Sequence, residues 1–131
     1  MDTDTVVVKF DTHYVGTLES PTATVALGSQ PNGAMPYHLL YGALASCFYS
    51  NFLSISKKKR LTFKDASITV SGIKREEMPA TLKTVHIELA VTEPSNETGL
   101  RSAAELGIKY CSIHETIKQV AEITLDIKFI K

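Results

Sequence analysis

The sequence predicts an α+β fold in a single domain, residues 1–131, with the element order β-β-β-α-β-β-α-β. Three observations predict it: short β-favouring runs near the start, one long segment with apolar residues at helical spacing, and later segments that alternate polar and apolar residues. The composition, 44% hydrophobic and 21% charged, is that of a globular protein. A chain of this size buries enough surface to fold without a disulfide or a metal.

The first part of the chain reads as three short strands. Val6 to Phe10, His13 to Leu18 and Thr22 to Leu27 are rich in β-branched and aromatic residues, with polar or proline-containing breaks between them. Residues 28–33, with two glycines and a proline, predict a loop.

A long helix should follow, because Pro36 suits a first helical residue and apolar residues then recur at helical spacing. These residues are Leu39, Leu40, Ala43, Leu44, Cys47, Phe48, Phe52 and Ile55. They occupy much of the helix circumference, so we expect this helix to be largely buried. It should end in the basic run from Lys57 to Arg60, where cations favour the negative end of the helix dipole.

The second half of the chain predicts two strands, a helical region and a last strand. Ser67 to Gly72, Thr81 to Thr92 and Ile123 to Ile130 alternate apolar and polar residues. A turn at residues 93–96 offers N-cap residues for a helical region over about 97–119, which should be interrupted or bent near Cys111 and Ser112. This order predicts helices packed on strongly curved antiparallel sheets.

The charge balance excludes several classes of partner. The chain has 14 basic and 14 acidic residues, so nothing draws it to nucleic acid or to an anionic membrane. No apolar run reaches the length of a membrane span, and the acidic start lacks the basic residues of a secretory signal. Phosphate-binding loops, serine nucleophile elbows and dinucleotide-binding turns are absent. We therefore expect a cytoplasmic protein.

The two cysteines, Cys47 and Cys111, are the strongest candidates for chemistry. In a reducing compartment such a pair is a set of inert core residues, a redox pair or metal ligands. Cys47 stands in the middle of the long helix, followed one turn later by the polar Asn51. His114 follows Cys111 at the spacing that places two side chains on one helix face. A protonated His114 there would lower the thiol pKa.

The start of the long helix resembles the central-helix motif of the OsmC/Ohr family, and Cys111 resembles that family's second cysteine. The residues that carry the first resemblance are Pro36, Leu39, Leu40, Gly42, Ala43, Leu44, Ala45, Ser46, Cys47 and Phe48. The resemblance implies an intertwined homodimer in which two central helices pack between curved antiparallel sheets.

The same resemblance implies a thiol-dependent peroxidase that reduces organic hydroperoxides in oxidative stress defence. Cys47 would be the peroxidatic cysteine, oxidised to a sulfenic acid, and Cys111 would resolve it as a disulfide. An external dithiol would then reduce the disulfide. No metal and no bound organic cofactor is implied.

The chain departs from the family at the residues that activate the thiolate. Peroxidase members carry a Glu where this chain has Tyr37, and an Arg from the N-terminal strands, whereas the arginines here are Arg60, Arg75 and Arg101. Ser112 replaces the Pro after the second cysteine. A buried thiol needs a donor or a cation to ionise near neutral pH. The candidates are His114 and His38 first, then Tyr37, Lys9 and His13.

Two other functions remain open. The chain could be a catalytically weakened relative that binds a small hydrophobic or acyl ligand at the dimer interface, with the cysteines lining the pocket. Alternatively, Cys47, Cys111, His114 and His38 offer four metal ligands, although no Cys-x-x-Cys pair supports this. The basic run from Lys57 to Arg60 is most simply a solvated helix end, with a phosphate or membrane contact as its functional alternative.

Overall fold

The computed structural model describes all 131 residues. The chain divides into two compact units, Met1–Leu40 and Tyr41–Lys131, and the division falls inside a helix. Each unit has its own three-stranded sheet. The single domain predicted from the sequence stays a prediction.

The first unit is an antiparallel meander in the order β1-β2-β3, so the three predicted strands are confirmed. The strands are β1 (Val7–Phe10), β2 (Val15–Glu19) and β3 (Thr24–Gly28). Gly28 closes β3 with a φ of 85°, and a side chain there would meet the backbone carbonyl of Tyr14. Glycine is therefore required where the chain leaves the sheet.

The sheet of the second unit has the order β4-β5-β6, with β4 (Asp65–Lys74), β5 (Leu82–Thr92) and β6 (Glu122–Ile130). β4 pairs with β5 antiparallel, but β5 pairs with β6 in parallel. The expectation of wholly antiparallel sheets is therefore wrong for this pair. The helical connection between β5 and β6 returns the chain to the end of the sheet where β5 begins. A parallel pair requires such a crossover.

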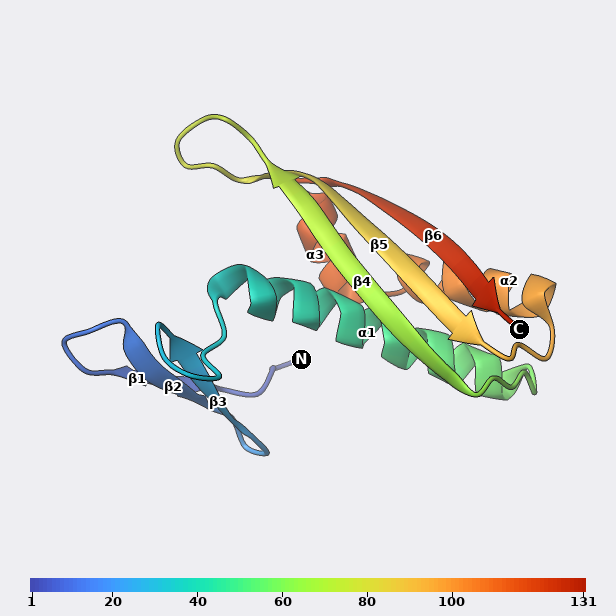
Figure 1. The fold of residues 1–131 in the computed structure, drawn as a ribbon, viewed down its shortest axis with the longest axis horizontal. Helices are drawn as coiled ribbons and strands as arrows, with labels where there is room; N and C mark the ends of the chain where they lie inside the picture. The colour runs from blue at the N-terminus through green and yellow to red at the C-terminus, as the bar shows by residue number, and fades with distance from the viewer. The chain divides into compact units, whose positions relative to one another are not determined.

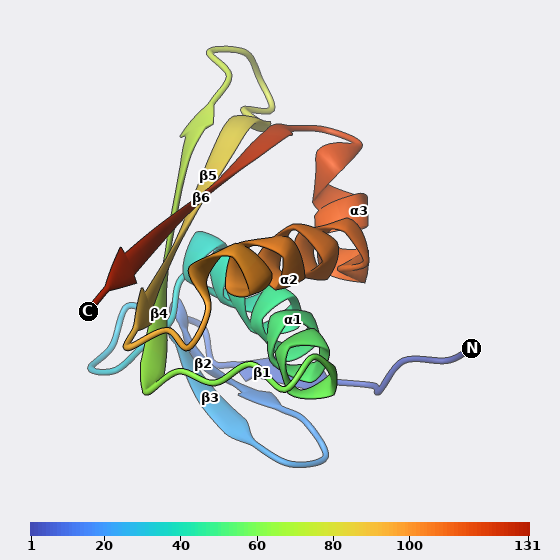
Figure 2. The ribbon, with the colours of Figure 1, turned by 90° about the vertical axis from the view of Figure 1, so that its right-hand side faces the viewer.

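The helices are α1 (Pro36–Lys58), α2 (Glu97–Lys109) and α3 (Ser112–Lys118). α2, α3 and the part of α1 from Tyr41 onward lie on one face of the β4–β6 sheet (Figures 1 and 2). Asn96 caps α2 by accepting a hydrogen bond from the Gly99 amide at 2.9 Å, as the predicted turn implied. The predicted interruption near Cys111 is confirmed, because the helical region is two separate helices, α2 and α3.

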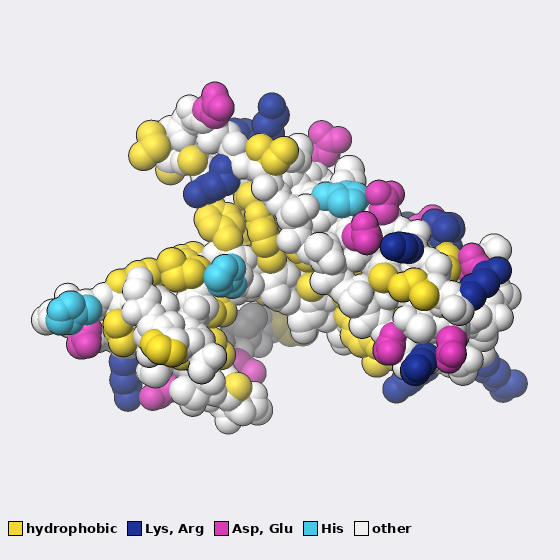
Figure 3. Space-filling model, viewed as in Figure 1, with side chains coloured by type: hydrophobic (Ala, Val, Ile, Leu, Met, Phe, Trp, Pro, Cys, Tyr) yellow, Lys and Arg dark blue, Asp and Glu magenta, His cyan; other side chains and the backbone are white.

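The core of the second unit lies between this sheet face and the helices. Alternate residues of β5 and one stripe of α1 are almost inaccessible to solvent. The largest are Leu44, Phe48, Phe52, Ile87, Leu89 and Leu100. The other face of the sheet carries acidic, basic and histidine side chains (Figure 3), among them His86, whose Nε2 lies 3.4 Å from Asp126 Oδ2. The alternation read from the sequence therefore separates a buried face from a polar one.

α1 is less buried than its pattern predicts. Only 22% of its apolar window is buried, although the sequence predicted a largely buried helix. By length and composition alone α1 could cross a membrane, contrary to the expectation that no apolar run reaches that length. That is weak evidence for a membrane, because core helices pass the same test. A single chain leaves apolar surface on α1 without a cover.

Candidate functional site

Cys47 lies where α1 and α2 approach each other closely. Cys47 is half-buried, and the next residue, Phe48, is fully buried. One turn further along α1, the side-chain amide of Asn51 donates a hydrogen bond to the Gly107 carbonyl of α2 at 3.3 Å. A Cβ on Gly107 would stand 3.1 Å from the backbone nitrogen of Phe52. The polar Asn51 and the glycine thus let the two helices come together beside the thiol.

Cys111 is the N-cap residue of α3. It occupies the break after α2 with an extended backbone, φ −78° and ψ 114°, and its side chain is fully buried. Its Sγ accepts a hydrogen bond from the backbone amide of His114 at 3.4 Å. The expectation that Cys111 and His114 share a helix face is therefore wrong, because Cys111 precedes the helix and His114 reaches the sulfur through its amide.

Both cysteines are free thiols, and they lie close enough to shift each other's pKa. Cys111 acts as the hydrogen-bond donor in this interaction, which lowers the pKa of Cys47 and raises that of Cys111. Donor groups of Ile113 and Ser112 also lower the pKa of the Cys47 thiol. Three consecutive residues, from Cys111 to Ile113, therefore supply the groups that favour the Cys47 thiolate.

These contacts move the two thiol pKa values in opposite directions. Burial raises the pKa of Cys47, but the hydrogen bonds from Ile113, Cys111 and Ser112 lower it by more, so the net pKa lies below the ordinary value. Burial and the contact with Cys47 raise the pKa of Cys111 to about 11. A single negative charge on the pair therefore resides on Cys47, while Cys111 keeps its proton.

His114 does not provide the expected cation. Burial lowers the pKa of its imidazole, and the charge of Lys118 lowers it further against the opposing effect of Glu115. The neutral ring is therefore favoured at neutral pH. Its Nδ1 is buried and has no hydrogen-bond partner. The contribution of His114 to the cysteine pair is its backbone amide.

The other predicted activating residues belong to the first unit, and their action on Cys47 stays a prediction. Within that unit, His38 Nδ1 accepts a hydrogen bond from the Met35 amide at 3.1 Å. Lys9 Nζ lies 3.5 Å from Glu19, and His13 Nδ1 lies 3.6 Å from Asp11. Tyr37 occupies the first turn of α1. The structure contains no group of three or more His, Cys, Asp or Glu side chains placed to hold a metal ion.

Sequence reasoning did not identify Ser112 and Ile113 as residues that influence the pKa of Cys47. In the sequence, Ser112 stands out only as a departure from the family motif, and Ile113 does not stand out at all. A signal was nevertheless present, since a break at Cys111 makes the next residues the first turn of a new helix. The first amides of a helix have no partner within it and are free to bind a nearby sulfur.

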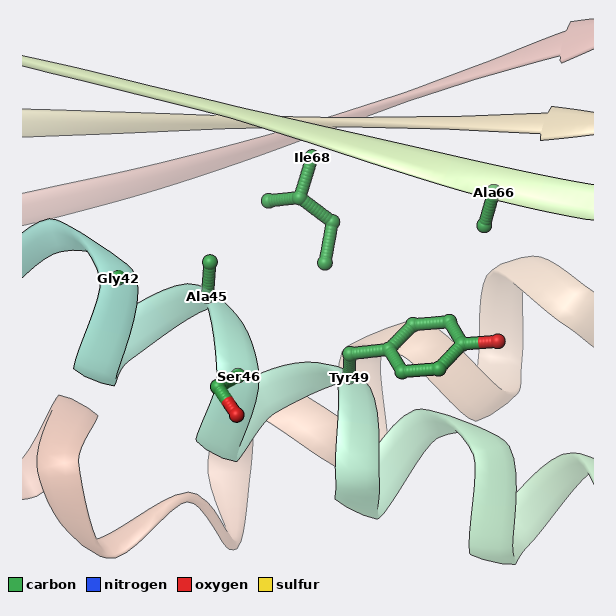
Figure 4. A pocket seen from close by; sticks show the side chains of 6 residues that line it. All are labelled: Gly42, Ala45, Ser46, Tyr49, Ala66 and Ile68. Atoms are coloured by element: carbon green, nitrogen blue, oxygen red, sulfur yellow. The ribbon is translucent and has the colours of Figure 1, made fainter. Parts of the chain in front are cut away.

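A separate pocket of about 320 Å³ lies between α1 and β4 (Figure 4). Small and apolar side chains line most of it, with Ala45 and Tyr49 on the helix and Ala66 and Ile68 on the strand. Neither cysteine lines this pocket. A second pocket of about 340 Å³ lies further along α1, between Leu53 and Phe63, and shares Tyr49 with the first.

Comparison with solved structures finds the same fold over the whole chain. A hypothetical protein from Aquifex aeolicus is 25% identical, covers 100% of both chains and has a TM-score of 0.85. An OsmC-like protein from Mycoplasma pneumoniae is 17% identical, with 99% of each chain covered and a TM-score of 0.86. An organic hydroperoxide resistance protein from Elizabethkingia anophelis is 12% identical, with 98% of this chain and 96% of that chain covered and a TM-score of 0.76.

A comparison with curated protein sequences finds no match. The sequence model of the family described as OsmC-like protein matches residues 28–126, which include α1, both cysteines and most of the second unit. This match covers well over half of the chain and agrees with the order of strands and helices, so the protein belongs to the OsmC-like family.

Proposed function

We propose that the protein is a thiol peroxidase that reduces organic hydroperoxides, with Cys47 as the peroxidatic and Cys111 as the resolving cysteine. The observation that carries this proposal is the proximity of the two thiols, which shift each other's pKa values in opposite directions. A peroxidatic cysteine must be a thiolate and must be reachable. Cys47 is half-buried with a lowered pKa, whereas Cys111 is fully buried with a raised one. Their environments therefore suit the two roles.

The reaction balances with a hydroperoxide and a dithiol as the only other reactants. The Cys47 thiolate attacks one peroxide oxygen, an S–O bond forms, the O–O bond breaks, and the alkoxide takes a proton from water. Sulfur is oxidised by two electrons and becomes a sulfenic acid. The Cys111 thiol then displaces the hydroxyl group, which leaves as water with the proton of Cys111. An external dithiol exchanges with the resulting disulfide and restores both thiols.

The relatives support a stress-related redox role. One structural neighbour is named an organic hydroperoxide resistance protein from Elizabethkingia anophelis and another the organic hydroperoxide resistance protein OhrB of Bacillus subtilis. The proposed location of the protein is the cytoplasm, where thiol reductants are available. It requires no metal and no bound cofactor, because sulfur alone carries the electrons.

The proposed functional form is a homodimer. Three quarters of the apolar window of α1 is not buried within one chain, and nearly half of the surface of Val7, Val8 and Phe10 is exposed on β1. Exposed apolar surface of this extent on both units favours a second copy as its cover. Sedimentation of the reduced protein at micromolar concentration checks this, and a monomer there counts against it.

The decisive test of the activity is oxidation of the reduced protein by cumene hydroperoxide. We expect the thiols to be consumed faster than free cysteine reacts, with peptide mapping finding a Cys47–Cys111 disulfide. Cys47→Ser should abolish the fast reaction. Thiols that persist at the rate of free cysteine contradict the proposal.

The apolar pocket between α1 and β4 favours one alternative, a protein that binds a small hydrophobic or acyl ligand. The pocket does not include the cysteines, so a binding protein would keep its ligand in Cys47→Ser. Titration with a fluorescent fatty-acid analogue distinguishes the two functions. Unchanged binding by Cys47→Ser, together with no peroxide consumption by the unmodified protein, would establish the alternative.

A further inference from the structure

The second pocket, of about 340 Å³ beside the C-terminal end of α1, combines apolar side chains with two lysines. Its residues all belong to the second unit. Its aliphatic and aromatic residues are half-buried, whereas the two lysines are exposed and therefore lie at its mouth. The apolar residues are Tyr49, Leu53, Leu61 and Phe63, and the lysines are Lys57 and Lys64.

The loop that forms one side of this pocket is held in place by the rest of the unit. The Thr62 amide donates a hydrogen bond to Ser95 Oγ at 2.9 Å, and the Ser95 amide donates one to the Thr62 carbonyl at 2.9 Å. The ring of Phe63 packs against the fully buried Phe52, with 5.6 Å between the ring centroids. The pocket is therefore formed before any ligand arrives, which lowers the entropy cost of binding.

The side chains of Lys57 and Lys64 form no ion pair or hydrogen bond within the chain. By contrast, Lys59 Nζ lies 3.3 Å from the Ser102 hydroxyl of α2. The dipole of α1 favours a cation at Lys57, in its last turn. It does not account for Lys64, which follows the helix and directly precedes β4. Two unpaired positive charges at the mouth of an apolar pocket match a ligand that is anionic at one end.

We propose that this pocket binds the carboxylate end of a free fatty acid, with Lys57 and Lys64 at the carboxylate and the aliphatic chain against Leu53 and Phe63. The ammonium group of lysine is a compact positive charge that suits an anionic head group. The site lies apart from both cysteines, so the inference goes beyond the proposed peroxidase function and does not depend on it.

The aliphatic chain has room to continue along α1. The second pocket shares Tyr49 with the first pocket, of about 320 Å³, which lies between α1 and β4 (Figure 4). Ala45 and Tyr49 of α1 and Ile68 of β4 line that first pocket, so its lining suits methylene groups. Each volume lies at the lower end of the range of small-molecule sites, about 300–1,000 Å³. Together the two pockets suit one extended chain with its charge at the lysine end.

A second copy of the protein is the competing occupant of this surface. An apolar face laid over the pocket would take Lys57 and Lys64 out of water without a counter-charge, and burial of an unpaired charge is costly. An amphiphilic anion covers the apolar residues and supplies the counter-charge at the same time. The charge at the mouth therefore favours the fatty acid.

The test is calorimetric titration of the full chain with decanoate and with 1-decanol, which has the same chain length without the charge. Decanoate should bind more tightly than 1-decanol. Changing both Lys57→Gln and Lys64→Gln should weaken decanoate binding about tenfold and leave 1-decanol binding unchanged. Lys58→Gln is the matched control, because it removes a charge from the same helix end but Lys58 does not line the pocket. Its decanoate affinity should stay at that of the unmodified protein.

A second variant tests the path of the chain. Ala45→Leu narrows the first pocket, so it should weaken the binding of decanoate more than that of hexanoate, whose shorter chain is expected to end near Tyr49. Equal effects on the two acids contradict the extended binding mode.

Equal losses in Lys58→Gln and in the double variant overturn the inference, because a general attraction to the basic helix end would then explain the binding. Absence of decanoate binding also overturns it and favours a second copy as the cover. Failure of the peroxidase proposal looks different. In that case the protein would bind decanoate without consuming cumene hydroperoxide, whereas consumption of the hydroperoxide without decanoate binding contradicts the present inference alone.

Discussion

The side-chain amide of Asn51 donates a hydrogen bond to the backbone carbonyl of Gly107 at 3.3 Å, one helical turn beyond the paired cysteines. Asn51 follows Cys47 on α1, and Gly107 precedes Cys111 at the end of α2. The contact fixes the two helices against each other at a point where Gly107 has no side chain to hold α2 away from the Phe52 backbone. It therefore positions the break at Cys111, and with it the start of α3, against the Cys47 sulfur.

Gly107→Ala should separate the helices and disturb the thiol pair. The added Cβ would lie 3.1 Å from the Phe52 nitrogen and 3.2 Å from its Cα, and backbone atoms cannot move aside as a side-chain end can. We expect a loss of about 1–3 kcal/mol in the free energy of unfolding, measured by urea denaturation, and slower disulfide formation. Gly42→Ala is the matched control, because its Cβ meets nothing within 4 Å and α1 should gain roughly 0.5–1 kcal/mol. Equal stability changes in the two variants would contradict this account.

Cys111→Ser should expose Cys47 to irreversible oxidation. Without a neighbouring thiol the sulfenic acid cannot be resolved as a disulfide, and further peroxide converts it to the sulfinic acid. After several equivalents of cumene hydroperoxide, mass spectrometry should find sulfinic acid at Cys47 in this variant and the disulfide in the unmodified protein. Recovery of a reducible Cys47 in the variant argues against Cys111 as the resolving cysteine.

The raised pKa of Cys111 should make the protein lose stability in alkaline solution. The folded protein holds this thiol protonated up to about pH 11, whereas an unfolded cysteine ionises near pH 8.5. The stabilisation is complete below the unfolded pKa and is lost as the pH rises through the folded pKa. Between these values the free energy of unfolding should fall by about 1–3 kcal/mol more in the unmodified protein than in Cys111→Ser. Parallel urea-denaturation profiles for the two proteins would rule this out.

His114→Ala should leave the ionisation of Cys47 almost unchanged. The ring of His114 has a lowered pKa, and what it brings to the cysteine pair is its backbone amide, which alanine retains. The rate of Cys47 alkylation by iodoacetamide as a function of pH should therefore match that of the unmodified protein. A rise of about one unit in the Cys47 pKa would instead restore the imidazolium mechanism that the sequence suggested.

Much of the fold could be predicted because it depends on local patterns. The alternation in β5, the helical spacing from Leu39 to Ile55 and the N-cap at Asn96 are each visible in a short stretch of sequence. Pairing direction is not local, so the parallel run of β6 beside β5 was missed. The exposure of α1 was missed for the same reason, since periodicity shows how apolar a helix is and not whether one chain covers it.

The sequence by itself determined the family to which the scaffold belongs and the two cysteines that are candidates for its chemistry, because those signals are residue identities in a motif. It also identified the residues that were absent, with Tyr37 in place of a Glu and no early arginine. Only the tertiary structure decided what lowers the Cys47 pKa. The groups on Ser112 and Ile113 that lower the Cys47 pKa belong to a segment far from Cys47 in the chain. They come near Cys47 because Gly107 has no side chain and lets α1 pack closely against α2, and because α3 begins after Cys111. A hydrogen bond between segments far apart in the chain depends on packing, which no local pattern records.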